Sequence, residues 1–92
     1  MEVKKIKEEN NNLILELAGE SKTFANLIRE EVWNSDGVSE AAAIQEHPYM
    51  EQPKLFLKME GRYSHKKALE DAAKRIEVKV KEFEKEFSRA FK

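Results

Sequence analysis

Cysteine is absent from this chain of 92 residues, and no stretch is apolar enough to cross a membrane. Without cysteine the chain has no disulfide, no thiolate metal site and no catalytic thiol. A membrane span needs about 18 consecutive apolar residues. The first ten residues, MEVKKIKEEN, also lack the apolar run of a signal peptide. These absences predict a small cytoplasmic domain with no membrane partner.

Excess charge of one sign is also missing. The chain has 17 basic and 18 acidic residues, so its net charge is -1. Such a balance argues against a nucleic-acid-binding module that depends on bulk positive charge. Hydrophobic residues make up 40% and charged residues 38% of the chain, which is typical of a globular domain with a heavily charged surface. The length predicts one domain over residues 1–92 with one modest core.

Alternating apolar residues predict four strands. The clearest are LILELAG (13–19) and KLFLKME (54–60), and weaker ones are EVKKIKE (2–8) and VSEAAAIQE (38–46). In the first strand Val3 and Ile6 are out of phase, which a β-bulge would reconcile.

Helical spacing predicts two helices between and after these strands. Thr23 can cap the first helix, in which four apolar residues form one stripe. These are Phe24, Leu27, Ile28 and Val32. Ser64 can cap the second helix, and no glycine or proline follows Gly61 to end it. The order β-β-α-β-β-α predicts an α+β fold, with helices on one face of a mostly antiparallel four-stranded sheet and a long C-terminal helix.

The last helix is too long for the sheet that these strands can build. From Ser64 to about Phe91 it would extend about 42 Å, whereas a seven-residue strand spans about 23 Å. Apolar residues nevertheless recur along it at alternating steps of four and three, a pattern typical of helix packing. They are Leu69, Ala73, Ile76, Val80, Phe83, Phe87 and Ala90, with Phe91 beside the end. The opposite face offers acid-first i,i+4 pairs, Glu70–Lys74, Asp71–Arg75 and Glu77–Lys81.

The distal apolar residues indicate a missing partner. Burying Val80, Phe83, Phe87 and Phe91 is worth roughly 6–12 kcal/mol, comparable with the whole net stability of a domain, about 5–15 kcal/mol. A continuous apolar patch of this kind usually marks an interface. The alternative is that the helix bends back or frays after about Lys81, so that the phenylalanines cover the edge of the sheet.

Three segments of the chain resemble one family. KTFANLIREEV, VSEAAAIQEHPYMEQPKLFLKMEG and ALEDAAKRI are similar to the small α-like subunits of DNA-directed RNA polymerases. This class includes subunit L in archaea and its counterparts in the eukaryotic nuclear enzymes, and it shares a core with the dimerising domain of the bacterial α subunit. The resemblance covers about Glu2 to Phe87. The chain departs from the family pattern at four positions: Lys22 for a common His, Ala43 for Tyr, Tyr49 for Leu and Met59 for Thr.

The resemblance implies a structural role inside a nucleotidyltransferase complex. Members of this class pair with a larger α-like subunit, which is called D in archaea, and the pair is a platform for the large catalytic subunits. The chain also has no Gly-rich phosphate loop, paired-carboxylate motif or nucleophile motif, so we expect no catalytic residue, no metal or other cofactor, and no direct nucleic-acid contact. The implied partner surface is Phe24, Leu27, Ile28, Val32, Ile76, Val80, Phe83 and Phe87. Some of the first four must also belong to the domain's own core.

Two other functions, and a homodimer that uses the same apolar face, remain open on the residues alone. The segment GRYSHKK (61–67) is a basic, aromatic-containing patch that could bind nucleic acid. His47, before Pro48 in a loop, could serve an enzyme or, with His65, a metal. Catalysis would need a partner group, and Glu46 would point to the opposite face of a strand. A metal would need further ligands that no local spacing supplies.

Overall fold

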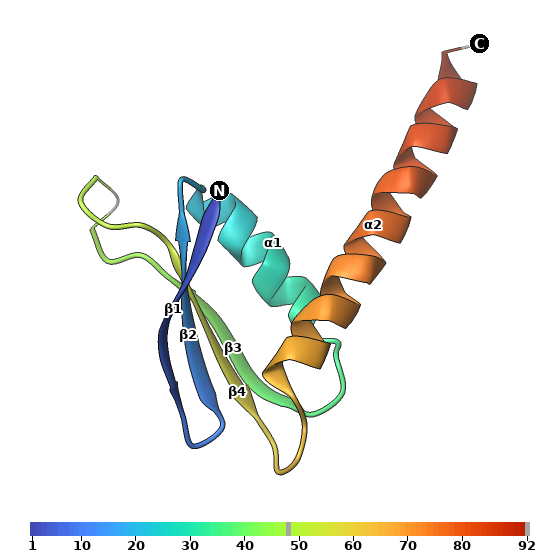
Figure 1. The fold of residues 1–92 in the computed structure, drawn as a ribbon. Coiled ribbons are helices and arrows are strands. Elements are labelled where there is room, and N and C mark those ends of the chain that lie inside the picture. The colour runs from blue at the N-terminus through green and yellow to red at the C-terminus, as the bar shows by residue number, and fades with distance from the viewer. Residues whose placement is uncertain (48, 92) are drawn as a thin grey trace.

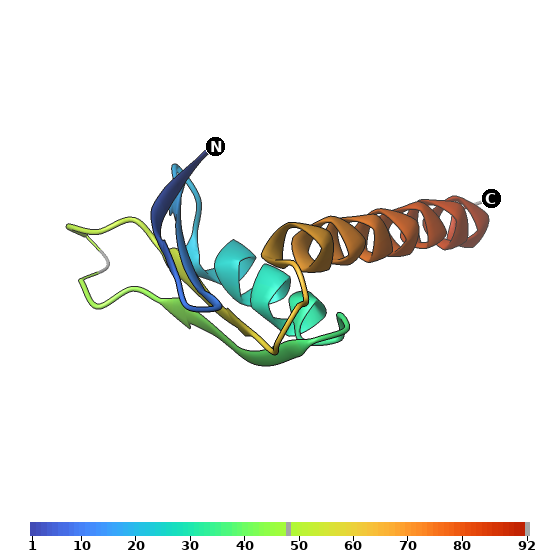
Figure 2. The ribbon, with the colours of Figure 1, turned by 60° about the horizontal axis from the view of Figure 1, so that its bottom comes forward.

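The structure, a computed structural model, describes residues 1–47 and 49–91. Its elements follow the predicted order β-β-α-β-β-α. They are β1 (Glu2–Glu9), β2 (Asn12–Ala18), α1 (Lys22–Val32), β3 (Val38–Ile44), β4 (Lys54–Met59) and α2 (His65–Ala90). All neighbouring strands are antiparallel, in the spatial order β1-β2-β4-β3. Both helices lie on one face of the sheet, and α2 projects beyond it (Figures 1 and 2), which confirms the predicted fold class.

The β1–β2 hairpin explains the irregular apolar pattern at the N-terminus. Lys5 pairs with Leu15 and Lys7 with Ile14, so Ile6 is the extra residue of a bulge. The predicted bulge is confirmed. The connecting loop has two residues, Asn10 and Asn11, with φ angles of 49° and 69°. Tight hairpins favour asparagine in this left-handed backbone because it tolerates positive φ better than other non-glycine residues.

Replacing Asn11 by alanine should therefore lower the free energy of unfolding by about 1 kcal/mol, as measured by denaturant titration. Asn11→Gly is the matched control and should keep wild-type stability, because glycine adopts positive φ freely. Both variants retain the Asn11 carbonyl, which accepts bonds from Met59 N–H at 2.9 Å and from the His65 ring at 2.8 Å. Equal stability of the two variants would contradict this interpretation of the turn.

The core lies between the helices and the two central strands. One face of β2 and β4 supplies Leu13, Leu17, Leu55, Leu57 and Met59, none of which is more than 5% exposed. The alternation of apolar and polar residues in the sequence therefore correctly predicted which side chains of β2 and β4 face the core. The helices add small or branched residues that allow close approach, namely Ala25, Val32, Ala68 and Ala72.

The start of α1 differs from the prediction. Ser21, not Thr23, is the N-cap: its backbone is extended, and its side chain accepts a hydrogen bond from the Phe24 N–H at 3.1 Å. Both residues carry a hydroxyl that could cap, so their types alone did not distinguish them. Gly37, after α1, has a φ of +83°, and a Cβ there would collide with the Tyr63 ring. This close approach explains why the turn requires glycine.

The long helix α2 begins as predicted, with Ser64 accepting a bond from the Lys67 N–H at 3.3 Å. It continues without interruption to Ala90. The Cα radius of gyration is 14.9 Å, whereas a compact domain of this length would have about 12 Å. The difference reflects the projecting half of α2 (Figure 1). Across the described residues, no helix combines the length and apolar character of a membrane span.

Candidate partner interface

The distal part of α2 exposes its apolar residues. Val80 is 50% exposed, Phe83 67%, Phe87 52% and Phe91 78%. The three rings form a row, with centroids 5.8 Å apart between Phe83 and Phe87 and 4.8 Å apart between Phe87 and Phe91. The helix neither bends back nor places these rings against the sheet, so the alternative arrangement is not adopted. We call Ile76, Val80, Phe83 and Phe87 the C-terminal seam.

The structure divides the apolar stripe of α1 between two roles. Val32 is fully buried in the domain's own core, and so it offers no surface to a partner. Leu27 is 47% exposed, and Phe24 and Ile28 are half-buried. Of the residues implied as partner surface, Val32 is therefore reassigned to the core. The other three remain accessible.

Phe24 and Ile28 line an apolar groove between the sheet and both helices. The groove has a volume of about 390 Å³, and its ten lining residues are all apolar. They include Val3, Leu15 and Leu17 from the hairpin and Ala73 from α2. Leu27 instead faces the corner between the helices, a hollow of about 430 Å³ that also contacts Ile76, Val80 and Phe83. The predicted surfaces of α1 and α2 thus meet at Leu27, in a hollow that is also lined by Glu30, Glu31, Asn34 and Lys79.

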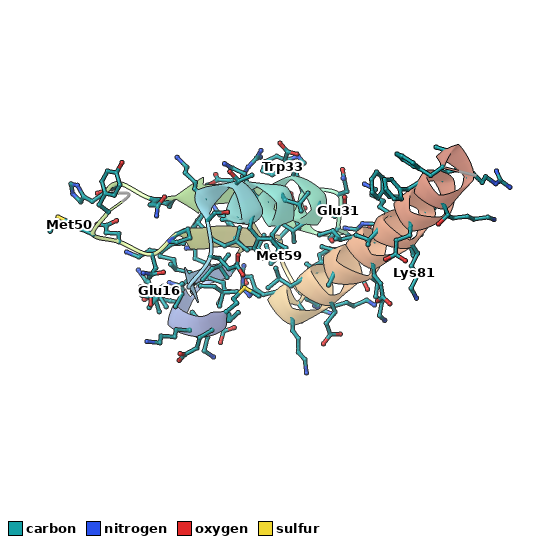
Figure 3. The ribbon with its side chains drawn as sticks, turned by 90° about the horizontal axis from the view of Figure 1, so that it is seen from above. Glu16, Glu31, Trp33, Met50, Met59 and Lys81 are labelled. Atoms are coloured by element: carbon teal, nitrogen blue, oxygen red, sulfur yellow. The ribbon has the colours of Figure 1, made fainter. Side chains whose placement is uncertain are left out.

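An ionic cluster around the buried Glu31 joins the two helices at this hollow, and Figure 3 shows Glu31 on the side of α1 that faces α2. Glu31 of α1 is only 7% exposed. Its carboxylate accepts bonds from Arg75 Nε at 2.7 Å and Lys79 Nζ at 2.8 Å. The Arg75 guanidinium also donates to the Glu31 carbonyl at 2.9 Å and to Ser35 Oγ at 2.7 Å, and Ser35 donates to the Ala68 carbonyl at 2.8 Å. We call these residues the Glu31 cluster.

The sequence did not reveal this cluster. It assigned Arg75 to a solvated pair with Asp71, but Asp71 contacts Lys67 at 3.7 Å and Glu70 contacts Lys66 at 3.9 Å. Only the pair Glu77–Lys81 was predicted correctly, at 3.2 Å. Glu31 directly precedes Val32, which enters the core together with Ala25, but adjacent helix residues point about 100° apart, so this position does not indicate burial. The cluster fixes the direction in which α2 leaves the domain, because its bonds span both helices.

The two cations determine the titration of Glu31. Hydrogen bonds from Lys79 and then Arg75 hold the pKa of the Glu31 carboxyl below its ordinary value, although burial opposes this. A carboxyl whose folded-state pKa is lowered stabilises the fold above its unfolded pKa, about 4.3. That contribution is lost as the pH falls through the lower folded-state value.

Acid should therefore weaken the domain partly through this residue. We expect the free energy of unfolding to fall below about pH 4.3, with a smaller fall in Glu31→Gln. Denaturant titrations at a series of pH values would measure how the free energy of unfolding depends on pH in each protein. Glu84→Gln, a change on the exposed end of α2, is the control and should keep the wild-type dependence on pH. Equal dependence of stability on pH in Glu31→Gln and wild type would show that folding does not lower the pKa of this carboxyl.

The loop after β3 differs from the expectation for His47. Glu46 and His47 lie beyond the end of β3 at Ile44, so the alternation of a strand does not separate them. A turn in which the His47 carbonyl accepts bonds from Met50 and Glu51 N–H brings Glu46, His47 and Glu51 together, with ligand atoms within 4.8 Å of one another. The expectation that no local spacing supplies further ligands was thus wrong. These groups are largely exposed, and proximity alone does not assign a metal. Pro48 lies outside the described residues.

The basic segment 61–67 is exposed except at His65, and several of its residues contact other parts of the domain. Lys66 and Lys67 contact acids one turn later on α2. The Tyr63 ring covers Gly37, and the His65 ring bonds to the Asn11 carbonyl at 2.8 Å and lies 3.9 Å from Glu8. His65 starts α2 at the end of the sheet opposite the His47 loop (Figure 1). The structure therefore does not bring the two histidines together.

Comparisons with known proteins match this architecture. The chain is 36% identical over 84 residues to the DNA-directed RNA polymerase subunit Rpo11 of Thermococcus sibiricus, covering 89% of this chain and 88% of the relative. It is 35% identical to the Rpo11 of Pyrococcus abyssi, covering 100% and 99%. The crystal structure of DNA-directed RNA polymerase subunit L from Thermoplasma acidophilum has the same fold, with a TM-score of 0.82, 20% identity and coverage of 98% and 88%.

These comparisons identify the family to which the chain belongs. The sequence relatives carry the name Rpo11, whereas subunit L is the name of the structural match. Residues 12–86 match the pattern of the RNA polymerase Rpb3/Rpb11 dimerisation domain, a range that includes α1 and most of both the groove and the C-terminal seam. The chain belongs to the RNA polymerase Rpb3/Rpb11 dimerisation domain family.

Proposed function

We propose that this chain is a non-catalytic assembly subunit of a cytoplasmic DNA-directed RNA polymerase. It pairs with the larger α-like subunit, the D type, and the pair is the platform on which the large catalytic subunits assemble. The role needs no cofactor and no direct nucleic-acid contact from this chain. Membership of a dimerisation-domain family supports the proposal. The single observation that carries it is the exposure of the C-terminal seam on a helix that extends past its own sheet.

The proposed interface has a projecting part and a receiving part. The C-terminal seam projects, and the apolar groove of about 390 Å³ receives a helix from the partner. Phe24 and Ile28 belong to the groove, and Leu27 lines the corner hollow together with Ile76, Val80 and Phe83 of the seam. A related partner fold would have the same two parts, so each subunit would cover the other's apolar surface. Helix-in-groove packing of this kind is a common recognition mode.

The test is to mix the purified chain with a D-type subunit and to measure the mass of the complex. The expected product is a one-to-one heterodimer that forms in preference to a homodimer of this chain. Failure to form it, with both chains folded, would contradict the proposal. A salt-dependent affinity of the isolated chain for nucleic acid would instead favour the basic segment 61–67 as the functional surface.

A further inference from the structure

The two edges of the sheet differ in their protection against further strands. The edge strand β1, EVKKIKEE, is mostly charged and contains the bulge at Ile6. The other edge strand, β3, has the sequence VSEAAAI with Glu40 as its one charged residue. Soluble proteins usually protect free edges with lysine, proline or bulges, because an unprotected edge pairs with other chains. The contrast marks the β3 edge as a surface that can accept a strand.

The β3 edge is regular over five residues. A bulge at Ser39 interrupts its start, and Glu40–Ile44 then pair one for one with Lys58–Lys54 of β4. Within the described residues, β4 is the only strand that pairs with β3. On an edge strand, alternate residues direct both their N–H and C=O groups away from the sheet. These groups provide a template for an added strand.

An exposed tryptophan lies beside this edge. Trp33 is the single tryptophan of the chain, and it is 49% exposed. Arg29, Glu30 and Trp33 of the α1 region line a hollow of about 410 Å³ together with Ala41 of β3. Figure 3 shows Trp33 at the margin of the molecule, on the opposite side from Glu16 of β2. The hollow shares Glu30 with the corner between the helices but involves none of the C-terminal seam, so we expect pairing through the seam to leave Trp33 accessible.

We propose that the β3 edge (Glu40–Ile44) and the Trp33 hollow form a second interaction surface. It accepts an extended segment of another polymerase subunit as a fifth strand, and an apolar side chain of that segment packs on Trp33 and Ala41. The identity of the occupant as a polymerase subunit rests on the proposed function. Strand addition fits the site because main-chain groups supply affinity and one adjacent pocket supplies specificity. Tryptophan is also among the residue types that are enriched at binding hot spots.

Hydrogen exchange measured by mass spectrometry can compare the two edges in one experiment. Within 38–44, the amides that face away from β4 should exchange at least about tenfold more slowly in the assembled polymerase than in the heterodimer. The amides of 2–9, at the opposite edge, are the internal control and should exchange equally in both. Equal exchange of 38–44 in both states would overturn the proposal. So would protection that depends on the concentration of the isolated chain, because the occupant would then be a second copy.

A matched pair of variants tests the hollow. Trp33→Ala should leave pairing with the D-type subunit unchanged but lower incorporation of the pair into polymerase about tenfold or more, and Trp33→Phe should restore most of it. Ile6→Ala removes a similarly exposed apolar side chain from the β1 edge and should have no effect. If Trp33→Ala weakened pairing with the D-type subunit instead, the hollow would belong to the first interface and this proposal would fail. Absence of pairing in the wild type would contradict the proposed function alone.

Discussion

Replacing Phe83 by aspartate should leave the domain folded and weaken pairing with the D-type subunit by about 30- to 1,000-fold. The side chain is 67% exposed in the free chain, so the change removes no core packing. In the complex the aspartate would place an unpaired carboxylate in an apolar contact, which adds to the loss of the aromatic ring. Phe87→Asp should behave in the same way. Circular dichroism would show whether the variant is folded, and isothermal titration calorimetry or surface plasmon resonance would measure its affinity for the D-type subunit.

Val78→Asp is the control for this prediction. Val78 is on the same helix and is 57% exposed, but it lies two residues from Ile76 and Val80, on the opposite face from the seam. The control should therefore retain wild-type affinity. Co-purification of Phe83→Asp or Phe87→Asp with the D-type subunit at wild-type yield would show that the seam is not the interface.

Breaking the Glu31 cluster should have the second largest effect. Arg75→Met removes the Nε–H bond to the Glu31 carboxylate and leaves Lys79 as its remaining cation. The free energy of unfolding should fall by about 1–3 kcal/mol, because the buried carboxylate loses one of its two cations and the Glu31 carbonyl and Ser35 Oγ lose the guanidinium donor. Since the cluster spans α1 and α2, we also expect weaker pairing, through a less fixed direction of α2. Denaturant titration and the affinity for the D-type subunit would measure the two effects.

Lys74→Met is the matched control for that variant. It removes an exposed cation from the adjacent position of α2 and should change the free energy of unfolding by less than about 0.5 kcal/mol. A loss in Arg75→Met no larger than this would show that the cluster contributes little to stability.

Much of the fold could be predicted from local patterns. Alternation placed Leu55, Leu57 and Met59 in the core because a strand has an invariant side-chain period. The phase error between Val3 and Ile6 correctly indicated a bulge. The C-terminal seam could be predicted because its apolar residues keep their helical spacing beyond the part of α2 that a sheet of this size can cover. These features depend on residues near one another in sequence or on simple lengths.

The errors concern features that depend on tertiary position or on exact element ends. The burial of Glu31 follows from how closely α1 approaches α2, and no pattern within α1 encodes that distance. The proximity of Glu46, His47 and Glu51 follows from the end of β3 at Ile44, two residues earlier than expected. Val32 belongs to the core and Leu27 to the surface, although both lie on one apolar stripe, because the angle between helix and sheet decides the boundary.

Thiol labelling offers the most direct measurement of whether a second polypeptide covers the distal half of α2. The chain has no cysteine, so Val80→Cys and Val78→Cys would each give it a single reactive thiol at similarly exposed valines two residues apart. In the free chain both thiols should react rapidly with a maleimide. After addition of the D-type subunit, the thiol at position 80 should become protected while that at position 78 stays reactive. Continued rapid labelling at position 80 within a verified heterodimer would contradict the account.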